Sequence, residues 1–255
     1  MSATEEAVGQ YKCWQCPNEE GTCKDIGVYI EWDTNTTRKC PCGQWRNHPT
    51  LVRFYEGDDA ANRLENAKGE SKKTTTRQRA QTFESFISSS QALTTARNRV
   101  RRYAEGFVPD QTDGILLMGP TGVGKSHLAT ALLLHLLQRG FMASMINVPA
   151  KLAEMKLSGF DNDMGNQLLA TVEAADLLIL DDIGAENPGG WASETLLMIL
   201  EKRFHVGKAT GFTMNILPSE ARARLGDRVY SRIHEMAPTE NRLIFTPDTK
   251  DWRMR

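Results

Sequence analysis

The residues most clearly suited to chemistry form a glycine-rich run that ends in a lysine and a serine, GPTGVGKS at residues 119–126. In such a run the glycines let backbone N–H groups turn toward phosphates, while the lysine ammonium and the serine hydroxyl serve the phosphates and Mg²⁺. The run follows the apolar stretch ILLM and precedes SHLATALLLHLL, the strand-to-helix context that such a phosphate-binding loop (P-loop) requires. It predicts ATP or ADP with Mg²⁺ at Gly119, Pro120, Thr121, Gly122, Val123, Gly124, Lys125, Ser126 and His127.

Acidic and amide side chains follow two later apolar runs. Asp181 and Asp182 end the run LLILDD, and Asn215 follows GFTM. At the carboxyl end of a strand beside the P-loop, Asp181 would hold Mg²⁺ together with Ser126, and Asp182 would lie where an attacking water sits. Asn215 would orient that water or contact the γ-phosphate, although an asparagine ending a strand is also a common turn former.

Two arginines lie four residues apart in RVYSRIHEM, a spacing that places Arg228 and Arg232 on one face of a helix. This pattern fits either a solvated basic face or an arginine that reaches the nucleotide of a neighbouring subunit. Spacing alone leaves both readings open.

Several segments together resemble the bacterial helicase-loader branch of the AAA+ ATPases, the DnaC/DnaI type, which also includes the IstB-type transposition ATPases. The matching segments are TFESF, GPTGVGKSHLA, LLILDDIGAE, TMN and LGDRVYSRI, and the resemblance extends from about Thr82 to the C-terminus.

The resemblance implies roles for the candidate residues by position. Asp181 and Asp182 form the Walker B pair, Asn215 is sensor 1, and Arg232 is the trans-acting arginine finger with Arg228 as the second candidate. Arg253 resembles a sensor 2 arginine, although the chain offers little or no helical lid to carry it. Asp182 stands where many AAA+ proteins have the longer glutamate, so we expect ATP hydrolysis that is slow or stimulated by a partner.

All five cysteines fall within the first 42 residues, which in a reducing compartment indicates metal binding before disulfides. The pairs Cys13/Cys16 and Cys40/Cys42 can close a tetrahedral Zn²⁺ site, with Cys23 and His48 in reserve. Bound zinc would stabilise a module that has little core of its own. The resemblance to loaders with an N-terminal zinc module implies that it docks on a hexameric helicase.

Strand-like and helix-like segments alternate after about Phe83, which predicts an α/β fold with a parallel sheet covered by helices on both faces. The expected strands are 115–118, 143–146, 177–180, 212–214 and 243–245, and the expected helices between them are 125–138, 166–174, 194–204 and 219–225. We expect a helix from Phe83 to about Gly106, because Leu93, Ala96, Val100 and Tyr103 share one face. The expected P-loop AAA+ core has five parallel strands and follows a small zinc-ribbon-like domain. The expected division is a zinc-binding, helicase-docking module at 1–56, a polar linker or solvated helix at 57–81, and an ATPase domain at 82–255.

The net charge of −1 limits nucleic-acid binding to local basic patches. Between residues 71 and 102 such a patch, or a solvated face, is formed by Lys72, Lys73, Arg77, Arg79, Arg97, Arg99, Arg101 and Arg102. No apolar run is long enough to cross a bilayer and no secretion signal opens the chain, so we expect a cytoplasmic protein without a membrane partner.

These features favour an ATP-dependent loader that self-associates, grips single-stranded DNA and places a replicative helicase on it. An IstB-type ATPase adaptor in DNA transposition is the main alternative. A third possibility is a zinc-dependent DNA-binding regulator whose P-loop only senses a ligand.

Overall fold

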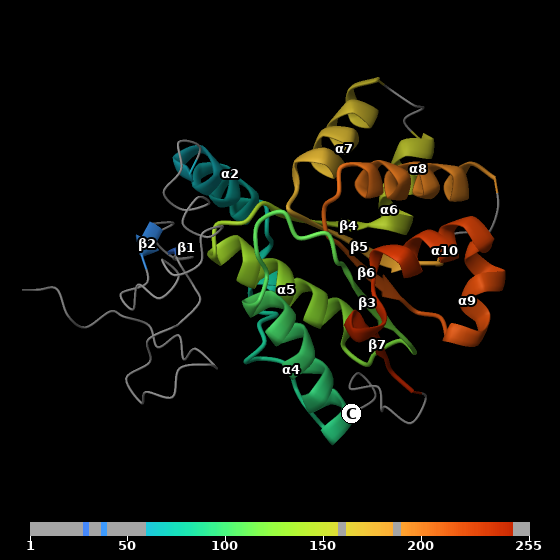
Figure 1. The fold of residues 1–255 in the computed structure, drawn as a ribbon, viewed down its shortest axis with the longest axis horizontal. Coiled ribbons are helices and arrows are strands. Elements are labelled where there is room, and N and C mark those ends of the chain that lie inside the picture. Colours follow the sequence, from blue (N-terminus) through green and yellow to red (C-terminus); the bar gives the residue numbers. More distant parts are fainter. Residues whose placement is uncertain (1–27, 31–36, 40–59, 158–161, 186–189, 247–255) are drawn as a thin grey trace, which may run out of the picture.

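The computed structural model describes residues 28–30, 37–39, 60–157, 162–185 and 190–246 (Figure 1). Ahead of the main domain, strand β1 (Val28–Ile30) pairs with β2 (Thr37–Lys39) in antiparallel fashion. The predicted zinc ligands and Arg253 lie outside the described residues. The metal site and the sensor 2 role therefore stay predictions.

A five-stranded sheet forms the centre of the molecule, with the strand order β4-β5-β6-β3-β7. All of its strand pairs are parallel, as the alternating sequence pattern predicted. The strands are β3 (Ile115–Met118), β4 (Ala143–Asn147), β5 (Leu177–Ile183), β6 (Thr210–Met214) and β7 (Arg242–Ile244). Because the strands are parallel, their carboxyl ends meet at one edge, where the P-loop begins.

Helices cover both faces of this sheet (Figure 1). On one side lie α2 (Ala60–Lys72), α4 (Gln91–Glu105) and α5 (Lys125–Gln138). On the other lie α6 (Val148–Leu157), α7 (Asn162–Ala174), α8 (Trp191–His205), α9 (Pro218–Leu225) and α10 (Asp227–Met236).

Alternate residues of β3 supply the two cores. Ile115 and Leu117 join the cluster beneath α4 and α5, whereas Leu116 and Met118 join the cluster on the opposite face. All four side chains are buried, as expected for a central strand with helices on both sides.

The segment after Phe83 differs from the prediction. Helix α4 begins at Gln91, where Ser90 caps it by accepting a hydrogen bond from the backbone N–H of Leu93 at 3.2 Å. A serine at this position satisfies an amide that the first helical turn leaves without a partner. Residues 82–90 are therefore not part of the helix, and they pass close to the P-loop.

Residues 57–81, predicted as a polar linker or a solvated helix, contain helix α2 and the short helix α3 (Thr76–Arg79). Ala67 is fully buried, Leu64 packs against the α4–α5 core, and α2 contacts α5 and β4. The described part of this segment therefore packs on the main domain. Helix α6 was not among the predicted elements.

The basic residues between 71 and 102 do not form one free patch. Arg99 donates to the carbonyl of Arg242 at 3.3 Å, Arg101 pairs with Glu84 and Glu105, and Lys73 pairs with Glu70. Those that lie in helices are divided between α2, α3 and α4, and Figure 1 shows α2 and α4 on different parts of the fold. A DNA-binding role for them stays a prediction.

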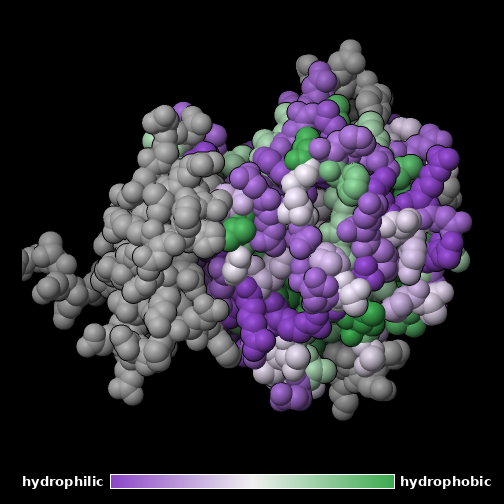
Figure 2. Space-filling view, viewed as in Figure 1, coloured by the Kyte–Doolittle hydropathy of each residue, from purple (hydrophilic) through white to green (hydrophobic). Residues whose placement is uncertain are grey.

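The face in Figure 2 is largely hydrophilic over the described residues, with small, separate hydrophobic areas. Among the helices that the structure describes, none combines the length and the apolar character that a membrane span requires.

Candidate functional site

The P-loop turns between the end of β3 and the start of α5 through glycines with positive φ angles. Gly119 has φ 143°, Gly122 has φ 74°, and Gly124, the N-cap of α5, has φ 95°. A Cβ on Gly119 would lie 2.4 Å from the backbone oxygen of Phe245, and one on Gly124 would lie 2.4 Å from the Phe86 ring. Only glycine fits both positions, and the loop keeps its backbone open to an anion.

Lys125 opens α5 and points back into this loop. Its side chain is buried, and its ammonium donates to the backbone oxygens of Gly119 at 2.9 Å and Pro120 at 2.5 Å. A buried ammonium held among loop carbonyls places positive charge where the phosphates of a nucleotide would lie. The cradle therefore fits the nucleotide that the sequence predicted.

Asp181 lies within β5, which continues past the expected end at Leu180 to Ile183. Its Oδ1 accepts hydrogen bonds from Ser126 Oγ at 2.9 Å and from Thr213 Oγ1 at 2.6 Å. The side chain is buried, whereas Ser126 is exposed. Hydroxyl and carboxylate oxygens are the ligands that Mg²⁺ prefers, so this pair suits the predicted magnesium site.

Asp182 has a left-handed backbone, with φ 65°, at an irregularity in the pairing of β5 with β6. Its backbone N–H donates to Thr213 Oγ1 at 2.9 Å, and its Oδ1 accepts a hydrogen bond from Asn215 Nδ2. A non-glycine residue in this region is strained, and such strain is concentrated at functional sites. The structure thus brings the predicted Walker B and sensor 1 residues together.

Thr213 links both aspartates, and sequence reasoning did not single it out. It lies in the segment TMN, in which only Asn215 has a predicted role. Thr213 can be identified only once the pairing of β5 with β6 is known, because this parallel register brings Thr213 beside Asp181 and Asp182.

A small cavity of about 140 Å³ adjoins the P-loop. Residues 82–87, which we call the strap, form one wall, and α4 and the P-loop form the others. The lining residues are Ser85, Phe86, Ile87, Leu93, Gly122, Val123, Gly124 and His127. Mainly apolar walls beside a phosphate cradle suit the flat ring of a nucleobase.

Arg232 lies on α10, and its partners among the described residues come from α8 and α10. Its guanidinium donates to both carboxylate oxygens of Glu201, at 2.9 and 3.1 Å, and to Glu235 at 2.5 Å. It also stacks over the Phe204 ring at 4.1 Å from the centroid. The structure does not bring Arg232 into the P-loop site of its own chain.

Arg228, one turn earlier on α10, is exposed and makes no ion pair with any residue that the structure describes. Both arginines line a surface groove of about 590 Å³ between α8 and α10, together with Leu197, Glu201, Asp227, Ser231 and Glu235.

In the described part of the chain, no cluster of three or more His, Cys, Asp or Glu residues is arranged to hold a metal ion. The predicted zinc ligands Cys13, Cys16, Cys40 and Cys42 lie outside that part.

Comparison with known proteins finds a match between residues 80–232 and the family model described as IstB-like ATP binding protein. The chain is 29% identical over 153 residues to the replicative helicase loader DnaC of Escherichia coli K12, and the matched region covers 59% of this chain and 62% of that protein. It is also 29% identical over 135 residues to the replicative helicase loader DnaC of Buchnera aphidicola subsp. Acyrthosiphon pisum, a match that covers 52% of this chain and 54% of that protein.

The chain thus spans little more than half the length of these curated relatives. Among solved structures, that of the DnaC helicase loader superposes with a TM-score of 0.56 at 24% identity, over 67% of this chain and 99% of that one. At this identity the superposition shows a shared fold.

Proposed function

Because the chain belongs to the family of IstB-like ATP-binding proteins, we propose that it is an ATP-dependent loader of a hexameric replicative DNA helicase onto single-stranded DNA. The observation that supports ATP dependence is that polar side chains from β5, β6 and the P-loop after β3 meet at one edge of the sheet. Ser126 Oγ lies 2.9 Å from Asp181 Oδ1, and Asn215 Nδ2 donates to Asp182 Oδ1. The names of the relatives support the helicase-loading part.

In this proposal the P-loop amides and Lys125 hold the phosphates of ATP or ADP, and Ser126 and Asp181 hold Mg²⁺. When bound, the metal neutralises phosphate charge and the triphosphate supplies the bond that water cleaves. Asn215 orients Asp182, whose short side chain limits how well it can position water. Hydrolysis is therefore slow in the isolated protein or stimulated by a partner. Whether ATP occupies the P-loop site then controls helicase loading.

The proposal also includes self-association through the groove between α8 and α10. The groove is lined by both acidic and basic side chains, which suits contact with the polar nucleotide site of a second copy of the chain. Arg232 would reach the neighbour's nucleotide by exchanging its carboxylate partners, Glu201 and Glu235, for phosphate. Arg228 needs no such exchange and remains the second candidate.

The remaining part of the proposal concerns residues 1–56. We propose that this segment forms the Zn²⁺-binding, helicase-docking module. A pull-down with the whole chain and with a variant in which Cys13 and Cys16 are serine tests this, with zinc measured on the same samples. Loss of zinc without loss of helicase binding would separate the two roles and contradict metal-dependent docking.

The family model also favours a second candidate, an IstB-type ATPase adaptor in DNA transposition. Co-purification from cells decides between them, because a loader retains a replicative helicase and an adaptor retains a transposase.

The test of ATP dependence measures ATP binding and turnover, with and without single-stranded DNA, for the wild type and Lys125→Ala. We expect the variant to lose detectable binding. Lys151→Ala, which removes a partly exposed lysine paired with Glu154 on α6, is the matched control and should behave as the wild type. Equal turnover in Lys125→Ala and the wild type would instead favour a regulator with an inactive P-loop.

A further inference from the structure

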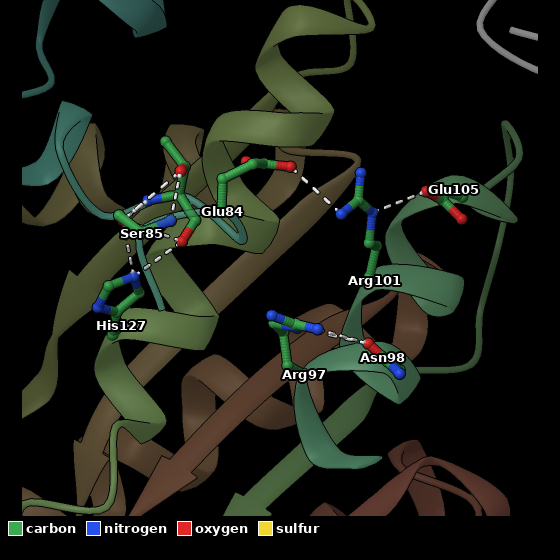
Figure 3. Close-up of polar contacts among 8 residues, drawn as sticks. Glu84, Ser85, Arg97, Asn98, Arg101, Glu105 and His127 are labelled. Atoms are coloured by element: carbon green, nitrogen blue, oxygen red, sulfur yellow. Dashed lines mark hydrogen bonds and ion pairs between the residues drawn. The ribbon is translucent and has the colours of Figure 1, made fainter. Parts of the chain in front are cut away.

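The strap, residues 82–87, is hydrogen-bonded to the P-loop helix through the side chain of His127 (Figure 3). Its Nε2 lies 2.8 Å from the backbone oxygen of Thr82 and 3.3 Å from Ser85 Oγ. His127 directly follows Ser126, so this attachment point lies one residue from the predicted magnesium ligand.

The neighbouring atoms fix the hydrogen on this ring. A carbonyl oxygen can only accept, so Nε2 must carry the hydrogen that it shares with Thr82. The Ser85 hydroxyl already donates to the backbone oxygen of Ala80 at 2.6 Å, so it too accepts from Nε2. His127 is therefore a donor that closes the strap onto α5.

The hydrogen bond between His127 and Thr82 accompanies an aromatic wall beside the P-loop. The Phe86 ring packs edge-on against His127, with centroids 5.3 Å apart, and lies so close to Gly124 that no Cβ would fit between them. Ile87 follows, and it lines the cavity although the residue is 64% exposed. A planar ring in the cavity would cover this exposed apolar surface.

Two strap residues that lie between Thr82 and Ser85 are anchored independently of His127. Phe83 is buried in the α4–α5 core, and Glu84 pairs with Arg101 at 3.2 Å, which in turn pairs with Glu105 (Figure 3). Loss of the His127 bond should therefore free the part of the strap over the P-loop without unfolding the domain.

We propose that His127 is a positioning residue that holds Phe86 and Ile87 in place to grip the nucleoside part of the ligand, while the P-loop alone grips the phosphates. This inference rests on the proposed nucleotide binding. It assigns to a P-loop neighbour a task that neither Lys125 nor Ser126 performs. The base and the phosphates are then held by separate parts of one site.

The proposal is tested by isothermal titration of the full chain with Mg²⁺-ATP and with Mg²⁺-tripolyphosphate, which has phosphates but no nucleoside. In His127→Leu we expect ATP affinity to fall about tenfold, as for a lost hydrogen bond and its wall, with tripolyphosphate affinity unchanged. His127→Gln, whose amide can donate in place of Nε2, should restore most of the ATP affinity. Glu65→Gln, which removes only the ion pair between Glu65 and Lys68 on α2, should match the wild type for both ligands.

Phe86→Ala provides a second route, because it removes the wall and leaves the His127 bond. It should show the same selective loss of ATP affinity, and thermal unfolding shows which variants are folded. Equal losses for both ligands, or no loss in His127→Leu and Phe86→Ala, would overturn the proposal. A wild type that binds tripolyphosphate and ATP equally would overturn it too, whereas a wild type that binds neither ligand would also overturn the proposed function.

Discussion

At the scale of single residues, the site depends on how one carboxylate oxygen is shared. Asp181 Oδ1 accepts from Ser126 and from Thr213, and Thr213 Oγ1 also accepts from the backbone N–H of Asp182. Thr213 thus fixes both aspartates before any ligand arrives. Such support raises the affinity of a metal site, because the ligands need not be reordered when the metal binds.

Replacing Thr213 by valine keeps the shape and removes the hydroxyl. We expect the affinity for Mg²⁺-ATP to fall about tenfold, because the partly buried N–H of Asp182 loses its acceptor and Asp181 loses a donor. Titration calorimetry measures this, with Thr171→Val as the matched control, since the Thr171 hydroxyl donates to the backbone oxygen of Gln167 within its own helix. Equal affinity in both variants would show that Thr213 does not order the site.

His135 provides a pH prediction away from the site. Burial, with help from Arg139 and Arg101, lowers the pKa of this histidine from 6.5 to about 3, and its Nε2 is buried without a hydrogen-bond partner among the described residues. Between these pKa values the unfolded chain binds more protons than the folded chain, so stability is lost as the pH falls below about 6.5. The free energy of unfolding should drop by about 1.4 kcal/mol at one pH unit below that value.

Urea denaturation at several pH values checks this. His135→Leu removes the titrating ring and should make the stability of the protein less sensitive to acid. If the two proteins lose stability in parallel between pH 7 and 5, the acid sensitivity comes from other groups.

At the scale of elements, the sequence predicted most of the strands and helices, and its errors have physical causes. Phe83 and Phe86 are three residues apart, a helical spacing, yet both serve the strap, and the cap at Ser90 decides where α4 begins. The predicted end of β5 at Leu180 was wrong because acidic residues usually mark a turn, whereas Asp181 is held within the sheet by hydroxyl partners. Thr213 could not be found without the strand register.

Arg203 shows how elements are joined by a buried charge that the sequence pattern did not reveal. It is fully buried on α8 and donates to the backbone oxygens of Val172 at 2.9 Å and Ala175 at 2.7 Å, at the end of α7. It also reaches Thr210 Oγ1 at the start of β6. Burial lowers its pKa to about 10, so the guanidinium stays charged at neutral pH.

Arg203→Met should lower the free energy of unfolding by roughly 3 kcal/mol, because it leaves buried carbonyls without donors. Lys202→Met, at the adjacent exposed position paired with Glu173, should change it by less than about 0.5 kcal/mol. Chemical denaturation of both variants gives the comparison. Similar values for the two would mean that water replaces the guanidinium at these carbonyls.

At the scale of the whole molecule, the proposed ATPase site needs two copies of the chain. One copy supplies the strand ends of the sheet, and the other supplies an arginine from the groove between α8 and α10. The P-loop, Asp181 and Asn215 gather at the carboxyl ends of β3, β5 and β6, whereas Arg232 is held between α8 and α10. The sequence could place each residue on its element. It could not show that the guanidinium of Arg232 is occupied by Glu201, because the two residues meet only when α8 and α10 pack.

A mixing experiment tests this division. Lys125→Ala lacks a working nucleotide site and keeps its arginines, whereas Arg232→Ala keeps the site and lacks the proposed finger, so each alone should show little ATP turnover. In a mixture, the Arg232→Ala site can receive an arginine from a Lys125→Ala neighbour, and turnover should rise well above the sum of the separate proteins. Mixing Lys125→Ala with Arg228→Ala indicates which arginine acts. A purely additive rate in both mixtures, at concentrations where the proteins associate, would rule out an arginine that acts between subunits.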